Sequence, residues 1–343
     1  MHGQARDSQS GTHLTRRGCL QGGAAFGLLL AVGLHGAAAA LPPRGALRVV
    51  VLSDLNGAYG STVYDGRVDE GVARTIALQP DLVLCTGDMV AAQRPRPLSR
   101  AELDAMWAAF RAHVSDPLAR AGLPFAVTPG NHDAALGTNF ALDRAVYREQ
   151  WLPRRPKLEL LSGSDWPFRY AFVLGEVFFA SLDVTFTGPM PAAERQWLRS
   201  LLAGPEATQA RARVLFSHVP MWSTAVGREH ERLADHALER VVIDGRVDLY
   251  LTGHHHAFYP GVKDGVRHVS QGCLGAAPRP LIGTRGRTPR SITLIDVERD
   301  GGLRLEGLAG AKFDTPIDRR TLPARIVTPE ATLLRDDLTG LHR

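Results

Sequence analysis

Apolar segments that end abruptly in polar residues recur along the chain and constrain its fold more than any other feature. Three early segments predict strands, and helical patterns separate them: strands at 47–53, 81–85 and 125–128, helices at 68–78 and 99–121. Ser99 and Glu102 have the spacing of a capping box, which is typical of a helix N-terminus. Strands that alternate with helices at this interval predict a parallel sheet with helices on its faces.

The pattern changes after residue 160. A hairpin with a two-residue turn is predicted first, and further strands and helices follow: hairpin strands at 168–174 and 177–182, helices at 194–202 and 229–242, strands at 213–216, 248–252, 266–270 and 291–297. We expect the last two strands to be antiparallel and to belong to a second sheet. The predicted fold is α/β, a four-layer αββα sandwich of two mixed sheets flanked by helices.

Three regions are expected along the chain. Residues 1–40 predict a cleaved signal peptide, residues 45–310 a single domain, and residues 311–343 a polar tail that packs on the surface or is partly disordered. Cys85 and Cys273 lie in apolar surroundings and are interpreted as small buried residues.

The first forty residues have the features of a secretory signal. Arg16 and Arg17 precede an apolar stretch that ends in a run of alanines at residues 37–40. The paired arginines resemble a twin-arginine signal, which bacterial export machinery reads as an address for folded proteins. The alternative is an uncleaved anchor helix, but the glycines and His35 argue against a stable membrane anchor. We expect a periplasmic or secreted protein.

Five predicted strands end in residues with metal-ligand chemistry: Asp54 and Asn56, Asp88, Asn131 and His132, His218, and His254 and His256. Each cluster alone has a simpler interpretation, as a turn residue, a helix cap or a solvated histidine. However, ligands of open α/β sheets gather beyond the carboxyl ends of the strands, so these clusters are expected to converge. In an extended segment His254 and His256 point to one side and His255 to the other.

These motifs resemble those of the calcineurin-like metallophosphoesterase superfamily. The resemblance covers residues 49–257 and rests on SDLNG at Ser53, TGD ending at Asp88, PGNHD at Pro129, SHVP at Ser217 and TGHHH at Thr252. It implies two metal ions, one held by Asp54, Asp88 and His256, the other by Asn131, His218 and His254, with Asp88 as the bridge. It also implies that His132 stays uncoordinated, contacts the substrate phosphate and helps to protonate the leaving group.

The resemblance implies hydrolysis of small-molecule phosphate mono- or diesters by a hydroxide that two metal ions activate. Mixed nitrogen and oxygen ligands suit manganese, iron or zinc better than calcium. The alternative is a catalytically weak or inactive fold member that acts as a binding protein. A nucleic-acid partner is not expected, because a formal net charge of +5 comes without a basic stripe.

The chain departs from the family pattern at its first metal site, where the family usually has a histidine two residues after the first aspartate. Asn56 occupies that position and offers an amide oxygen, which suits hard ions better than soft ones. Tyr59 is an alternative ligand or a loop residue. Purple acid phosphatases have a tyrosine where this chain has Ala91, so that branch is not assigned.

Several residues outside the motifs have either two possible interpretations or a structural one. Arg279 could bind a substrate phosphate or be a solvated arginine. His230, His255 and His268 are interpreted as surface or packing residues, Asp183 as structural, and Asp133 as an orienting partner of the site.

Overall fold

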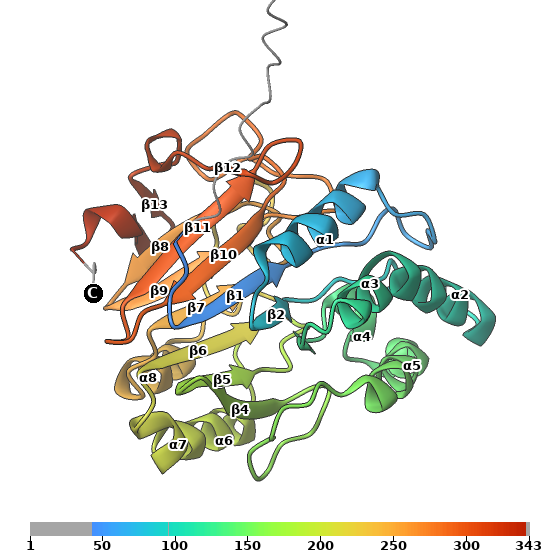
Figure 1. Ribbon diagram of the computed structural model, residues 1–343, viewed down its shortest axis with the longest axis horizontal. Helices are drawn as coiled ribbons and strands as arrows, with labels where there is room; N and C mark the ends of the chain where they lie inside the picture. Colours follow the sequence, from blue (N-terminus) through green and yellow to red (C-terminus); the bar gives the residue numbers. More distant parts are fainter. Residues whose placement is uncertain (1–42, 95, 341–343) are drawn as a thin grey trace, which may run out of the picture. The chain divides into compact units, whose positions relative to one another are not determined.

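The structure is a computed structural model that describes residues 43–94 and 96–340. Within those ranges the strands form two mixed sheets flanked by helices (Figure 1), so the predicted fold is confirmed. The signal predicted for residues 1–40 lies outside the described residues. No helix within the described ranges combines the length and the apolar character needed to cross a bilayer.

The first sheet joins the beginning of the domain to its C-terminal part. Its order is β12-β11-β10-β1-β2-β3. The strands are β1 (Leu47–Leu52), β2 (Leu82–Cys85), β3 (Phe125–Val127), β10 (Ile292–Val297), β11 (Leu303–Ala309) and β12 (Thr315–Pro316). β1, β2 and β3 are parallel neighbours, so their carboxyl ends lie at one edge. All six residues of β1 are buried, as the apolar pattern predicts.

The second sheet has the order β13-β14-β8-β9-β7-β6-β5-β4. Its strands are β4 (Tyr170–Leu174), β5 (Val177–Ser181), β6 (Ala212–Ser217), β7 (Leu249–Thr252), β8 (Tyr259–Lys263), β9 (Val266–Ser270), β13 (Arg325–Val327) and β14 (Thr332–Arg335). β5, β6 and β7 are parallel neighbours. The predicted hairpin turn between β4 and β5 is confirmed, because Gly175 and Glu176 both have positive φ, as a two-residue turn of type I′ requires.

Helices lie on either side of the sheets in Figure 1. They are α1 (Gly66–Leu78), α2 (Arg100–Phe110), α3 (Asp116–Arg120), α4 (Asn131–Ala134) and α5 (Ala141–Trp151), then α6 (Ala192–Leu202), α7 (Pro205–Thr208) and α8 (His236–Asp244). The capping box is confirmed, since the Ser99 hydroxyl accepts from the Glu102 backbone N–H and the Glu102 carboxylate accepts from the Ser99 N–H. A π-helical turn (Arg111–Ser115) joins α2 to α3, so the predicted helix continues to residue 120.

The helix predicted at 229–242 begins later than expected. The Asp235 side chain accepts hydrogen bonds from the backbone N–H groups of Ala237 and Leu238, which starts α8 at His236. Residues 229–235 therefore form a loop, and this loop carries an acidic side chain, Glu231, into the cavity described below.

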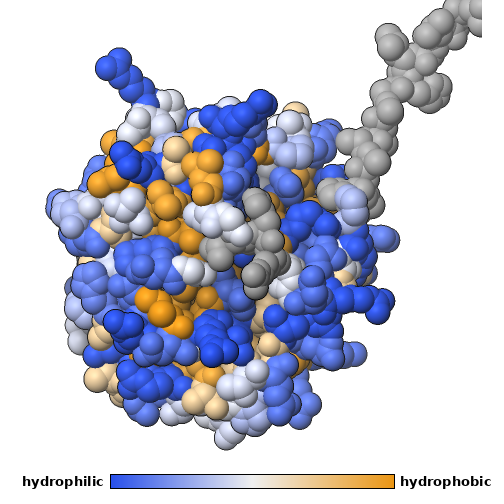
Figure 2. All heavy atoms as spheres, turned by 90° about the vertical axis from the view of Figure 1, so that its left-hand side faces the viewer, coloured by the Kyte–Doolittle hydropathy of each residue, from blue (hydrophilic) through white to orange (hydrophobic). Residues whose placement is uncertain are grey.

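The C-terminal part also differs from expectation. β10 belongs to the first sheet, antiparallel to β1, and β9 is parallel to β7 and antiparallel to β8. Residues 312–340 are integrated into the fold, because β14 pairs with β8 and buries Leu333. The apolar positions in this region are single residues between polar ones, so the sequence carried only a weak pattern. On the side of β8 and β13, hydrophilic side chains surround small apolar patches (Figure 2).

Candidate metal centre

The strand ends that face one another hold four polar residues in a strained backbone conformation. Asp54 follows β1, Asp88 follows β2, and His254 and His256 follow β7, with φ values of 51°, 56°, 66° and 54°. Residues other than glycine seldom adopt this left-handed region, although aspartate and histidine tolerate it better than most. Backbone hydrogen bonds fix two of these loops together, since Leu55 N–H donates to the Asp88 carbonyl over 2.8 Å.

Two motif glycines let the loops approach closely. A Cβ atom at Gly130 would lie 2.1 Å from the backbone nitrogen of Asp88, and one at Gly253 would lie 2.4 Å from the Ser53 hydroxyl. A side chain at either position would push the loops apart. The glycines of the PGNHD and TGHHH motifs therefore serve the close packing of the strand ends.

Asp88 lies at the centre of the cluster. Its carboxylate belongs to two groups of potential ligand atoms, each within 4.8 Å: Asp88, His218 and His254, and Asp54, Asp88 and His256. Burial alone would raise the pKa of Asp88, but the neighbouring His218 and His132 outweigh it and hold the pKa well below its ordinary value. Asp88 is therefore a buried carboxylate shared by two groups of potential metal-ligating atoms.

The first group pairs Asp54 with His256. The His256 Nε2 lies 3.2 Å from the Asp54 carboxylate, and its Nδ1 lies 3.1 Å from the Ala277 carbonyl. When the ring is neutral and Nδ1 donates to that carbonyl, the Nε2 lone pair is available to a metal ion beside Asp54. The Ser53 hydroxyl also donates to Asp54 over 2.6 Å, which fixes the carboxylate. Burial raises the pKa of Asp54, but His256 and His218 together leave it lowered.

The second group brings two imidazole nitrogens face to face. His218 directs Nδ1 to the Thr86 carbonyl at 2.8 Å, and His254 directs Nε2 to the Glu231 carboxylate at 2.8 Å. When both imidazoles are neutral, as metal binding requires, and both outer nitrogens donate, the inner ones, His218 Nε2 and His254 Nδ1, are lone pairs 3.2 Å apart. The Asn131 amide oxygen lies 2.9 Å from the same His218 nitrogen. Three acceptors that converge in this way suit a cation between them.

The electrostatics fit a cation as well. Burial lowers the pKa of His218, but Asp88 and Asp54 reverse the effect and raise that pKa to about 9. A buried histidine with such a pKa marks a point where the surroundings favour positive charge. A metal ion supplies this charge while leaving the imidazole neutral and free to coordinate.

Asn56 adds a further acceptor. Its side chain is 4% exposed, and its amide oxygen has no hydrogen-bond partner among the described residues. An unpartnered buried carbonyl oxygen is costly unless something binds it. The residues of both groups, together with this oxygen, therefore fit a metal centre of mixed nitrogen and oxygen ligands.

His132 lies at the edge of the cluster. Its Nε2 is 3.8 Å from the Asp88 carboxylate and its Nδ1 is 3.2 Å from the Ala92 carbonyl. The ring faces a cavity of about 490 Å³, which Asn131 and His254 also line. His132 is absent from both groups of converging ligand atoms, so it is placed to contact a molecule in the cavity.

Sequence reasoning missed two side chains that orient the cluster. Glu231 accepts from His254, and Gln93 accepts from the Asn131 side-chain N–H over 2.6 Å, which turns the Asn131 oxygen toward His218. The sequence offered no signal for either, because Glu231 fell within a predicted helix and Gln93 within a loop.

The remaining candidates have mainly structural places. Asp133 accepts three backbone N–H groups, from Met89, Val90 and Gly130, and so joins the loops that carry the site. The other residues also have structural surroundings: Asp183 pairs with Arg144, His255 and His268 are buried, and His230 is exposed. Cys85 and Cys273 are buried and free, as predicted. The Tyr59 ring lies against His132, with ring centroids 4.8 Å apart.

Replacing Glu231 with alanine is expected to weaken metal binding by about 10–100-fold, because His254 loses the partner that fixes its tautomer and ring orientation. Chelator competition on wild-type and variant protein measures the change. Glu229→Ala is the matched control, since Glu229 is an exposed acid of the same loop. Equal metal affinity in wild type and Glu231→Ala would exclude this orienting role.

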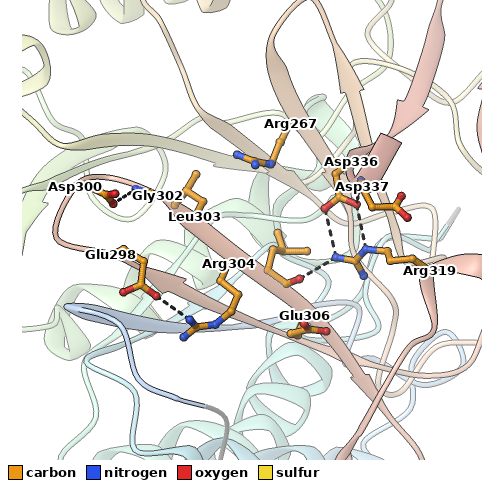
Figure 3. A pocket seen from close by; sticks show the side chains of 11 residues that line it. Arg267, Glu298, Asp300, Gly302, Leu303, Arg304, Glu306, Arg319, Asp336 and Asp337 are labelled. Atoms are coloured by element: carbon orange, nitrogen blue, oxygen red, sulfur yellow. Dashed lines mark hydrogen bonds and ion pairs between the residues drawn. The ribbon is translucent and has the colours of Figure 1, made fainter. Parts of the chain in front are cut away.

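A second cavity, of about 510 Å³, lies elsewhere and is lined by charged residues of β9, β11 and the C-terminal segment (Figure 3). Arg319 pairs with Asp336, and Arg304 pairs with Glu298. None of the residues that line it belongs to the strand-end motifs. The charged residues of this cavity therefore balance one another in ion pairs.

The chain resembles known phosphoesterases. The sequence profile described as calcineurin-like phosphoesterase matches residues 47–258. Purple acid phosphatase 22 of Arabidopsis thaliana is 28% identical over 184 residues, which are 52% of this chain and 38% of that protein. The matched part thus spans less than half of this curated relative.

Solved structures share the fold. Purple acid phosphatase PPD1 from yellow lupin (Lupinus luteus) seeds has a TM-score of 0.59 at 16% identity, over 80% of this chain and 54% of that one. A dimetal phosphatase from Danio rerio has a TM-score of 0.55 at 15% identity, over 77% of this chain and 96% of that one. At these identities the likeness is one of architecture.

Proposed function

Because the chain belongs to the calcineurin-like phosphoesterase family, we propose that it is a phosphoesterase that depends on two metal ions. The observation that carries the proposal is the position of Asp88, whose buried carboxylate is shared by two groups of converging ligand atoms. One carboxylate between two ions is what a two-metal site needs. The likeness to purple acid phosphatases does not extend to their tyrosine, since Ala91 offers no phenolate.

The proposed ligands divide between two positions. Asp54, Asn56 and His256 would hold one ion, Asn131, His218 and His254 the other, and Asp88 would bridge them. Bound ions would supply acidity that makes hydroxide available from water near neutral pH and would offset the charge of the phosphoryl oxygens. The mixed ligand set suits manganese, iron or zinc.

The protein's own groups carry out the remaining tasks. His132 faces the cavity from outside the ligand groups, so we assign it to the phosphate and to protonation of the leaving oxygen. Its backbone N–H donates to the Asp88 carboxylate over 2.9 Å, which fixes the main chain of His132 relative to the centre. The cavity of about 490 Å³ suits a small-molecule phosphate mono- or diester.

Metal analysis together with an assay tests the proposal. About two equivalents of manganese, iron or zinc per chain, with hydrolysis of 4-nitrophenyl phosphate that a chelator abolishes, is the expected result. One equivalent or none, without turnover, would instead support the alternative of a binding protein with a degenerate first site.

Replacing Asn56 with histidine is expected to tighten binding of the more weakly held ion by about tenfold or more, which corresponds to ~1.4 kcal/mol. The reason is that imidazole binds these metals better than an amide oxygen does. Isothermal titration calorimetry, in which the metal is added to metal-free wild-type and variant protein, measures the change in affinity. An unchanged affinity would mean that position 56 does not face the ion.

We also propose export to the periplasm or beyond. The support is the Arg16-Arg17 pair before an apolar stretch, both outside the described residues. Cell fractionation of an Arg16→Lys, Arg17→Lys double variant tests this, and an unchanged periplasmic fraction would contradict twin-arginine export.

A further inference from the structure

The cavity beside the metal centre is lined by both polar and apolar side chains. The polar part includes Asn131, His132 and His254 together with the charged side chains of Arg228 and Glu231. The apolar part is contributed by separate segments of the chain: Tyr59, Leu136, Phe140 and Phe186. Tyr59 and Leu136 are 58% and 47% exposed, so two large apolar side chains border an opening instead of packing in the core. Exposed apolar groups that gather around a pocket mark a surface that binds something.

The backbone of Tyr59 is fixed although its ring is exposed. Ser61 N–H donates to the Ala58 carbonyl over 2.9 Å, which closes a β-turn with Tyr59 and Gly60 at its centre. Gly60 has a φ of +78°, which the third position of a type II turn requires. Gly60 N–H also donates to the Ala91 carbonyl over 2.7 Å, and this bond attaches the turn to the segment after β2. The turn therefore presents the ring at a defined place.

The Tyr59 ring lies next to the His132 ring, and this position indicates what the apolar side chains of the cavity bind. The two ring centroids are 4.8 Å apart, with an angle of 39° between the planes. If His132 protonates the leaving oxygen, the rest of the leaving group must lie next to His132, because a proton donor works within hydrogen-bond reach. Tyr59 is then the first large side chain that the leaving group meets, and Phe140 lines the same cavity.

We propose that the substrates are phosphate esters whose leaving group carries a flat aromatic ring, which packs against Tyr59 beside His132. The inference rests on the proposed phosphoesterase function and adds a substrate class to it. Aromatic rings attract one another beyond the burial of apolar area, so a planar leaving group gains contacts that an aliphatic one of equal size does not. The phosphoryl end faces the ligand groups, and the aromatic end faces the opening.

Two esters separate aromaticity from size and reactivity. Benzyl phosphate and cyclohexylmethyl phosphate have leaving groups of similar bulk, and both are primary alcohols. The wild-type enzyme with its metals is expected to prefer the benzyl ester in kcat/KM. Tyr59→Ala is expected to lower kcat/KM for the benzyl ester by about 2- to 12-fold, mainly through KM, and to change the cyclohexylmethyl ester less than twofold.

Matched variants make the outcome specific. Tyr59→Phe keeps the ring and is expected to retain the preference, and Leu152→Ala, an exposed leucine outside the cavity, is expected to change nothing. A nucleoside monophosphate, assayed in parallel, distinguishes a distant nucleobase from a ring next to the ester oxygen. Preference for the nucleotide over the benzyl ester would reject a ring packed beside His132.

Failure of the inference and failure of the proposed function differ. Turnover of both esters with equal kcat/KM, or an equal loss for both in Tyr59→Ala, would overturn the aromatic substrate class while leaving the phosphoesterase intact. A change confined to kcat would make Tyr59 a positioning residue for His132 and would also reject the inference. No hydrolysis of any ester by metal-loaded protein would reject the proposed function itself.

Discussion

Asp88→Asn is expected to release most of the bound metal and to lower kcat by more than ~10³-fold. The carboxylate lies in both groups of ligand atoms, so its loss affects both ions at once. A neutral amide in its place also leaves His218 and His254 facing one another without the negative charge that balances a cation. Metal content by mass spectrometry and the rate of aryl phosphate hydrolysis measure the two effects.

Asp183→Asn is the control for this experiment. Asp183 also follows a strand of the second sheet, but it pairs with Arg144 and belongs to neither ligand group. It is expected to keep both metals and the wild-type rate. Thermal unfolding of both variants separates loss of ligands from loss of fold. A folded Asp88→Asn protein that retains two ions and activity would show that Asp88 is not the bridge.

The convergence of the candidate ligands could be predicted from the sequence because these residues follow the ends of strands. Each motif places a candidate ligand soon after an apolar strand, and parallel strands bring those ends to one edge of each sheet. The motif glycines support the same prediction, since a side chain at Gly130 or Gly253 would collide with the neighbouring loop. At these positions the local sequence pattern and the close packing of the loops agree, so the sequence alone predicts that the side chains meet.

The residues that orient the ligands could not be predicted in this way. Glu231 reaches His254 only because α8 starts at His236, and that start depends on the Asp235 cap overriding a helical pattern that continues upstream. Gln93 has a φ of +63° and lies in an irregular segment. Neither position has a periodicity, so their roles depend on tertiary contacts that a single sequence does not display.

The same limit applies to the outer strands. Strand β14 pairs through its backbone with β8 and buries Leu333, while Leu334 is 42% exposed. A four-residue strand with one buried apolar side chain carries little signal in a polar segment. The sequence pattern therefore predicts a tail for the C-terminal residues, whereas in the structure they extend the second sheet.

His132→Ala is expected to keep both metals and to slow turnover by about 10²–10⁴-fold, the usual contribution of a general acid. Metal binding should persist because His132 belongs to neither ligand group and because alanine retains the backbone N–H that donates to Asp88. Kinetics of the metal-loaded variant, with metal content measured on the same sample, test both parts. His256→Ala provides the contrast, since it removes a potential ligand and should lose metal.

The leaving group distinguishes a general acid from other roles of His132. A 4-nitrophenolate ion departs readily without a proton, whereas an alkoxide does not, so the loss in His132→Ala should be much larger for benzyl phosphate than for 4-nitrophenyl phosphate. Equal losses for the two esters would instead assign His132 to binding of the phosphate, and loss of metal would make it a ligand. Because Tyr59 packs on the same ring, Tyr59→Ala should change the selectivity between aromatic and aliphatic esters but not this dependence on the leaving group. The two variants together therefore separate where the leaving group sits from how it is released.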